Sequence, residues 1–115
     1  MTTFRKILIA VKNPDARRQP GVEKALHIAK TLGASVELFH AISAPVFLEL
    51  QPLTGRSIAE LRREAIGLRQ ERLKKLVVYA HRLGLTASAT VEWDFPPHEA
   101  IVRRAVQSRA DLVIA

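Results

Sequence analysis

Candidate binding groups lie where the first apolar segment of the chain ends. Lys12 and Asn13 directly follow the apolar run 7–11, and three more charged residues come shortly afterwards: Asp15, Arg17 and Arg18. Positive charge at the mouth of a crevice attracts anionic groups such as phosphates. The loop nevertheless matches neither the P-loop nor the dinucleotide-binding motif, whose glycines let the backbone approach a phosphate closely. Lys12 could contact a phosphate through its side chain or could be an ordinary solvated residue, and the sequence leaves both readings open.

The other groups that could do chemistry are scattered. The four histidines are His27, His40, His81 and His98, and no two of them have the spacing of metal ligands on one element. The chain contains no cysteine, so it has no thiolate metal site and no thiol nucleophile, and with the histidines scattered we predict no metal site. It also contains no nucleophile elbow and no obvious carboxylate pair for acid–base catalysis, so we name no catalytic residue. We interpret His40, late in an apolar segment, as a hydrogen-bonded core histidine. A non-enzymatic role is favoured, without being decided.

The charge balance raises the question of an anionic macromolecule as partner. The formal net charge is +7, and cations gather between positions 56 and 75. The seven cations are Arg56, Arg62, Arg63, Arg69, Arg72, Lys74 and Lys75, against Glu60, Glu64 and Glu71. Nucleic-acid binding would call for aromatic side chains interleaved with these cations, and the segment has none. We therefore interpret it as a solvated helix face, with nucleic-acid binding kept as an alternative.

The elements that must position these groups alternate between strands and helices. Strands are predicted over 6–11, 35–42, 86–93 and 111–115, and helices over 20–32, 57–83 and from 96 onwards. The first and last strands are continuously apolar, as in buried parallel sheets, whereas strict alternation in the third is typical of an edge strand. Gly33 should end the first helix, and Ser57 with Glu60 forms a capping box for the second.

Two helix faces are predicted to be inward. The face of the long helix comprises Ile58, Leu61, Ala65, Leu68, Leu76, Ala80 and Leu83, interrupted by Arg72. The face of the last helix comprises Ile101, Val102, Ala105 and Val106. The loop 43–56 between the second strand and the long helix is long enough to suggest a role.

The order β-α-β-α-β-α-β predicts an α/β fold with a doubly wound parallel sheet, because such crossovers are right-handed and place helices on both faces. The 115 residues suffice for a single domain, 1–115. A last strand that is apolar on both faces requires one more covering helix, so we expect the domain to be C-terminally incomplete or completed by another chain. The longest apolar run is too short for a membrane span, and we expect a cytoplasmic protein.

Four segments in this order resemble the universal stress protein (UspA-like) family. They are Lys6–Val11, Ala29–Ala34, Val36–Ala41 and Ala110–Ala115. The resemblance implies a Rossmann-like domain that lacks the family's last helix and strand, is dimeric or paired in tandem, and acts in stress resistance. It also implies that ATP or AMP is a candidate ligand, because some members of the family bind one of these nucleotides and others do not.

The resemblance also suggests site residues. In nucleotide-binding members, adenosine contacts an acidic residue that ends the first strand and the residue after the second strand's histidine, which correspond here to Lys12 and Ala41. The glycine motif that holds the triphosphate would begin just past Ala115. The candidate nucleotide-binding residues are therefore Lys12, Asn13, Ala41 and Ala115. Lysine in place of the usual aspartate removes an acceptor and adds a charge, which argues against the ordinary adenosine contact. We thus expect a non-enzymatic domain acting through ligand sensing or protein association, with ATP or AMP binding as the alternative.

Overall fold

The computed structural model describes residues 4–42, 57–94 and 96–115. Its elements are β1 (Lys6–Ala10), α1 (Pro20–Leu32), β2 (Ser35–Ile42), α3 (Ile58–Arg82), β3 (Ala87–Trp93), α4 (Pro97–Ser108) and β4 (Leu112–Ile114). The predicted alternation of strands and helices is confirmed. The loop 43–56, to which we assigned a possible role, lies outside the described residues.

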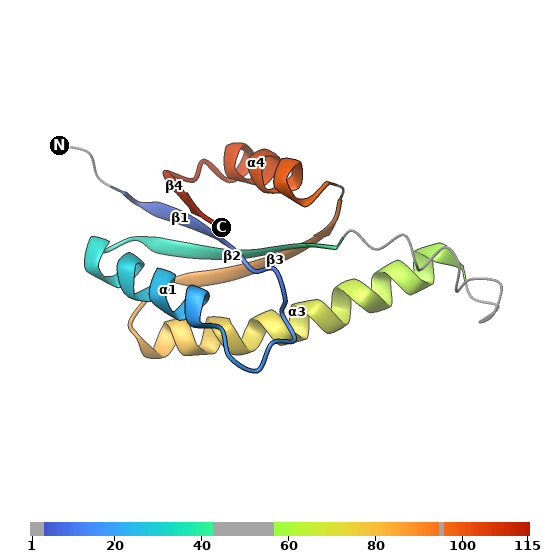
Figure 1. The fold of residues 1–115 in the computed structure, drawn as a ribbon, viewed down its shortest axis with the longest axis horizontal. Helices are drawn as coiled ribbons and strands as arrows, with labels where there is room; N and C mark the ends of the chain where they lie inside the picture. Colours follow the sequence, from blue (N-terminus) through green and yellow to red (C-terminus); the bar gives the residue numbers. More distant parts are fainter. Residues whose placement is uncertain (1–3, 43–56, 95) are drawn as a thin grey trace.

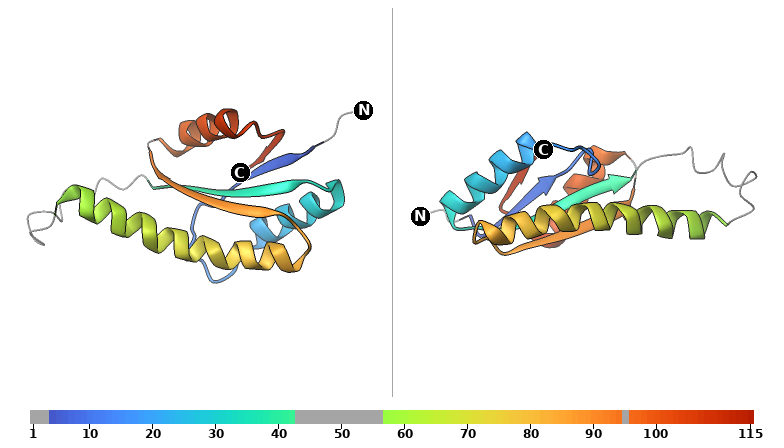
Figure 2. Two further views of the ribbon diagram at one scale, coloured as in Figure 1. Left: turned by 180° about the vertical axis from the view of Figure 1, so that it is seen from behind. Right: turned by 90° about the horizontal axis from the view of Figure 1, so that it is seen from below.

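The four described strands form one parallel sheet in the order β3-β2-β1-β4. Helices α1 and α3 cover one face of this sheet and α4 covers the other (Figures 1 and 2). The predicted doubly wound α/β fold is therefore confirmed. The chain proceeds from β1 through β2 to β3 on one side and then returns to place β4 on the other side of β1. The strand order thus reverses between β1 and β4, which is where folds of this kind bind ligands.

Local signals in the sequence explain where the helices begin and end. Gly33 ends α1 with a φ of 68°, a left-handed conformation that glycine adopts without steric cost. Ser57 caps α3 by accepting a hydrogen bond at 3.1 Å from the backbone N–H of Glu60. Arg109 ends α4 in the same left-handed region, with a φ of 56°, although it carries a side chain.

The core has two parts, one on each face of the sheet. The larger part lies between the sheet and α1 and α3, and it includes the fully buried Leu26, Leu38 and Leu73. The smaller part, centred on Leu8, Phe39 and Ala100, lies between the sheet and α4. The predicted burial of β1 is confirmed, because Ile7, Leu8 and Ile9 are all at most 1% exposed. The position of β3 at an edge of the described sheet is confirmed as well.

The predicted inward face of α3 is partly wrong. Leu61, Ala65 and Ala80 are buried as expected, but Leu68 is 60% exposed. The fully buried residue of the middle turns is instead Leu73. Steps of four residues from Leu61 reach positions 65, 69 and 73, and these positions form the stripe of α3 that packs on the sheet. Leu68 precedes position 69 and therefore lies beside this stripe.

Two expectations near the end of the chain are also wrong. In α4, Ile101 and Ala105 pack against the core as predicted, but Val102 and Val106 are 62% and 74% exposed, and the fully buried residue is Ala100. In β4, Val113 is 40% exposed and its two neighbours are only half-buried, so the strand is not fully buried among the described residues. An apolar side chain is able to be buried, but whether it is buried depends on which other elements pack against it. C-terminal incompleteness stays a prediction.

Candidate ligand-binding site

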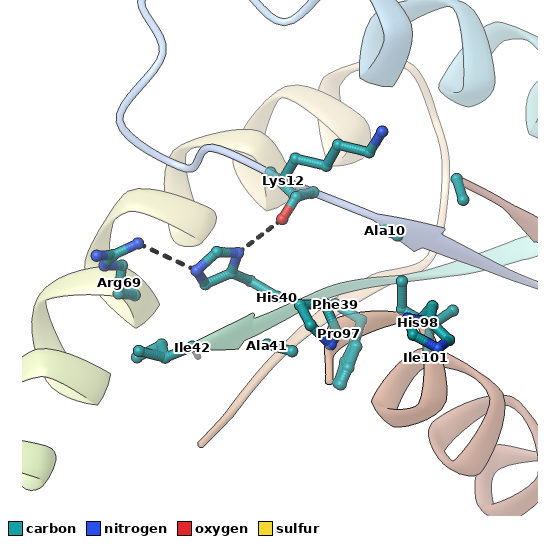
Figure 3. Close-up of a pocket in the computed structure, with 12 residues that line it drawn as sticks. Ala10, Lys12, Phe39, His40, Ala41, Ile42, Arg69, Pro97, His98 and Ile101 are labelled. Carbon is teal, nitrogen blue, oxygen red and sulfur yellow. Dashed lines mark hydrogen bonds between the residues drawn. The ribbon is translucent and has the colours of Figure 1, made fainter. Parts of the chain in front are cut away.

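A pocket of about 670 Å³ opens at the carboxyl ends of β1, β2 and β4 (Figure 3). It is lined by Ala10, Val11, Lys12, Phe39, His40, Ala41, Ile42, Arg69, Pro97, His98, Ile101 and Ala115. The volume is in the range of small-molecule sites. The pocket lies at the point where the strand order reverses, as expected for a doubly wound sheet.

Both sheet faces and two helices contribute to this pocket. Its walls are mostly apolar, with Phe39 and Ile42 from β2 and Ile101 from α4. Its polar lining side chains are two basic groups, Lys12 and Arg69, and two histidines. A pocket with these walls and charges can hold a flat apolar group together with an anionic one.

His40 is the most constrained polar residue of the pocket. It is 6% exposed, and its Nδ1 lies 2.7 Å from the carbonyl oxygen of Val11. Because a carbonyl only accepts, we assign the proton to Nδ1, which leaves Nε2 as an acceptor. Nε2 then accepts a hydrogen bond from Nη1 of Arg69 at 3.1 Å. Our interpretation of His40 as a hydrogen-bonded core histidine is confirmed.

The neutral form of His40 is favoured by its surroundings. Burial lowers the pKa of His40, because a charged imidazolium would lose its hydration. The positive charge of Arg69 lowers this pKa further, whereas the hydrogen bond to Val11 and the carboxylate of Asp15 oppose the shift. The net direction is downward, so the ring is neutral near pH 7 and keeps Nε2 available to Arg69.

The structure brings together three of the four candidate site residues. Lys12, Ala41 and Ala115 all line the pocket, whereas Asn13 is not among the lining residues. Asn13 instead organises its own loop: Oδ1 accepts from the Asp15 N–H at 3.1 Å, and its carbonyl accepts from Gln19 Nε2 at 2.6 Å. Figure 3 shows the Lys12 amine directed away from the pair formed by His40 and Arg69.

Sequence reasoning missed Arg69, which it counted among the cations of a solvated helix face. The side chain is half-buried and reaches the pocket from α3. The available signal was its position four residues from both Ala65 and Leu73, which places it on the buried stripe of the helix. His98 and Pro97 were missed as well, because their place at the start of α4 had no marker of a ligand site.

Among the residues that the structure describes, no three histidine, aspartate or glutamate side chains cluster in a way that could hold a metal ion. No helix in the described ranges is both long and apolar enough to cross a membrane.

The fold and the pocket define a doubly wound α/β domain with a pocket at the reversal of its strand order. The model of the universal stress protein family matches residues 3–115. The chain therefore belongs to the universal stress protein family, and the resemblance seen in its sequence is confirmed. No curated protein matches the sequence closely enough to count as a relative.

Solved structures of the family share this fold. The universal stress protein UspA from Lactobacillus plantarum superposes with a TM-score of 0.72 at 17% identity, covering 99% of this chain and 77% of that one. A universal stress protein from Archaeoglobus fulgidus in complex with dAMP gives a TM-score of 0.65 at 20% identity, covering 97% and 80%. A universal stress protein in complex with cAMP gives 0.56 at 15% identity, covering 97% and 71%. At these identities the likeness establishes a common fold.

Proposed function

We propose that this universal stress protein domain binds an adenine nucleotide, with AMP and ATP as the candidates, in the pocket at the strand ends. The observation that carries the proposal is one pocket of about 670 Å³ that combines apolar walls with two cationic side chains. Such a pocket suits a ligand with a flat base at one end and a phosphate at the other. That two structures of the same fold hold dAMP and cAMP supports adenine as the base.

The lining residues suggest how such a ligand would lie. Ala41 has a short side chain, so it leaves room for a ring at the end of β2. Lys12 carries a charge at the mouth and cannot accept a hydrogen bond, so its favourable partner is a phosphate rather than the amino group of adenine. Recognition of the base then depends on shape and apolar contact with Ile101. We expect modest affinity and modest discrimination between bases.

Isothermal titration with AMP tests the proposal. Ala41→Phe fills the pocket and should abolish binding, provided that circular dichroism shows a folded variant. Lys12→Ala should weaken AMP binding by about two- to fivefold, the range of an exposed ion pair. Arg18→Ala is the matched control, because it removes a cation from the same loop at a residue outside the pocket lining.

The proposal fails if AMP and ATP give no heat of binding at millimolar concentration. It also fails if folded Ala41→Phe binds AMP as well as the unmodified protein does. If Lys12→Ala and Arg18→Ala weaken binding equally, the specific role assigned to Lys12 at the phosphate is wrong and only the general charge of the loop matters.

A second candidate function is association with another copy of the domain, in a separate chain or in tandem. We infer it from the apolar surface formed by Val102 and Val106 of α4 with Val113 of β4, which are 62%, 74% and 40% exposed. These residues line one shallow groove together with Ala105 and Ala110. Exposed apolar patches of this kind are typical of interaction surfaces.

Light scattering coupled to size-exclusion chromatography tests the association. Val106→Glu should shift the protein towards the monomer, because it places a charge in the apolar groove. Val78→Glu is the control: Val78 is a similarly exposed valine, 48% accessible, on α3 at the opposite face of the sheet. A monomeric unmodified protein, or equal effects of the two variants, would exclude this surface as the contact between copies.

A further inference from the structure

Among the described residues, the guanidinium of Arg69 has no carboxylate partner, unlike three other arginines on the helices. Arg72 pairs with Asp15 at 3.2 Å, Arg103 with Asp94 at 2.6 Å and Arg104 with Glu37 at 2.7 Å. Among the described residues, Arg69 has no ion pair, and its hydrogen-bond partner is the neutral Nε2 of His40. Within the described ranges, the half-buried positive charge of Arg69 therefore contacts a neutral acceptor and no carboxylate.

The hydrogen bonds of His40 fix where Arg69 can point. Nδ1 of the ring is tied to the Val11 carbonyl at the end of β1, so Nε2 faces α3 and receives Nη1 of Arg69 (Figure 3). The histidine thus holds the guanidinium at the rim of the pocket. One N–H of the guanidinium is used in this contact, and a guanidinium carries five in a planar fork. The remaining donors are enough for a bidentate contact with a planar or tetrahedral anion.

We propose that Arg69, positioned by His40, binds the phosphate of the pocket's ligand. The inference rests on the proposed nucleotide-binding function and adds to it the orientation of the nucleotide in the pocket. The phosphate lies on the side of the pocket formed by α3, where Arg69 makes the direct contact, and the base lies towards Ala41 and α4. Lys12, whose amine is directed away from this side, then acts on the phosphate through its positive charge at the mouth rather than by a hydrogen bond. The phosphate would supply the negative charge that Arg69 lacks within the described residues, and it would do so where apolar walls exclude part of the water. His40 acts as a positioning residue and makes no contact with the phosphate.

The test compares adenosine and AMP by isothermal titration, since the two ligands differ only by the phosphate. Arg69→Gln should weaken AMP binding by about ten- to hundredfold, the range expected for loss of a charge-assisted hydrogen bond, and should leave adenosine within about twofold. Arg69→Lys keeps the charge without the fork and should recover part of the loss. Arg72→Gln is the matched control, because it removes an arginine of the same helix that lies outside the pocket lining. Melting curves establish that each variant is folded.

Inorganic pyrophosphate, titrated alone, separates this inference from the proposed function. If neither adenosine nor AMP binds but pyrophosphate binds through Arg69, the nucleotide proposal fails and the anion site stands. If AMP binds and Arg69→Gln leaves the ratio of AMP to adenosine affinity unchanged, the nucleotide proposal stands and the role of Arg69 is refuted. Equal loss in Arg69→Gln and Arg72→Gln would likewise refute it.

Discussion

A buried ion pair beneath α4 allows a quantitative prediction about what holds that helix to the sheet. Glu37 of β2 is 1% exposed. Its Oε2 accepts hydrogen bonds from Nε of Arg104 at 2.8 Å and from Oγ1 of Thr90 at 2.7 Å. Lys6 Nζ lies 3.5 Å from the other carboxylate oxygen. Burial alone would raise the pKa of Glu37, but the bonds from Thr90 and Arg104 and the nearby positive charges hold it below its ordinary value.

The perturbation is Arg104→Met, which keeps most of the apolar stem and removes the charge. Removing one partner of a buried pair costs about 3–5 kcal/mol, because the other charge stays in the interior unpaired. Here the Arg104 side chain is 27% exposed, and Thr90 and Lys6 still contact the carboxylate. Solvent and the remaining partners reduce the cost, so we expect the free energy of unfolding to fall by about 2–3 kcal/mol.

Urea unfolding followed by circular dichroism at pH 7 measures the loss. Glu37→Leu combined with Arg104→Met removes both charges and should be more stable than Arg104→Met alone, because no ion is left buried without its partner. Arg103→Met, at an exposed ion pair of the same helix, should change little. A single Arg104→Met variant as stable as the unmodified protein would refute the reasoning, as would a double variant less stable than the single one.

Further outcomes follow from the same structure. Because the pKa of Glu37 is lowered in the folded protein, its ionised carboxylate stabilises the fold above the ordinary carboxyl pKa near 4.5, and this stabilisation is lost as the pH falls through the folded-state pKa. Glu37→Gln should therefore make the free energy of unfolding depend less on pH in acid. The pKa of His40 is also lowered in the folded protein, so the unfolded chain takes up a proton first and the free energy of unfolding should decline as the pH falls below about 6.5. In urea unfolding at several pH values, His40→Asn should remove this decline. An unchanged dependence of the free energy of unfolding on pH would contradict the prediction. Leu73→Ala should cost about 2–5 kcal/mol and Leu68→Ala about 0.5 kcal/mol or less, and equal losses would place the buried stripe of α3 wrongly. Arg109→Gly should stabilise by about 0.5–1 kcal/mol by relieving a positive φ, whereas destabilisation would show that the arginine side chain matters more than its backbone.

The order and type of the elements could be predicted because local signals agree with the fold. The glycine at 33, the proline at 20 and the serine at 57 each act within one helical turn, and each marks the expected boundary. The orientation of a helix about its own axis was harder to predict. In α4, valines at 102 and 106 have the same hydrophobicity as buried residues, and only the position of β4 and the sheet shows that they face outwards.

The candidate binding site could be located in outline from the sequence, but its side-chain contacts could not. The ends of β1, β2 and β4 were identifiable because parallel strands direct their carboxyl ends to one edge, and Lys12, Ala41 and Ala115 do line the pocket. The spacing of Arg69 from Ala65 could have placed it on the inward face of the helix, but its contact with His40 could not be predicted, because that partner is 29 positions away in the sequence. A contact between a helix and a strand end of this kind depends on tertiary packing, which the pattern of a single segment does not contain.

The pairing of β4 with β1 has a consequence for the synthesis of the chain. The Asp111 carboxylate accepts the backbone N–H groups of Arg5 and Lys6, across separations of 106 and 105 residues. In the described part of the domain, β1 therefore acquires its second neighbour only when the residues of β4 have left the ribosome. At about 5–20 residues per second this takes roughly 5–20 s, during which one edge of an apolar strand has no partner from β4. The order of the strands, rather than the final stability of the domain, sets the length of the interval in which the nascent chain is most exposed to aggregation.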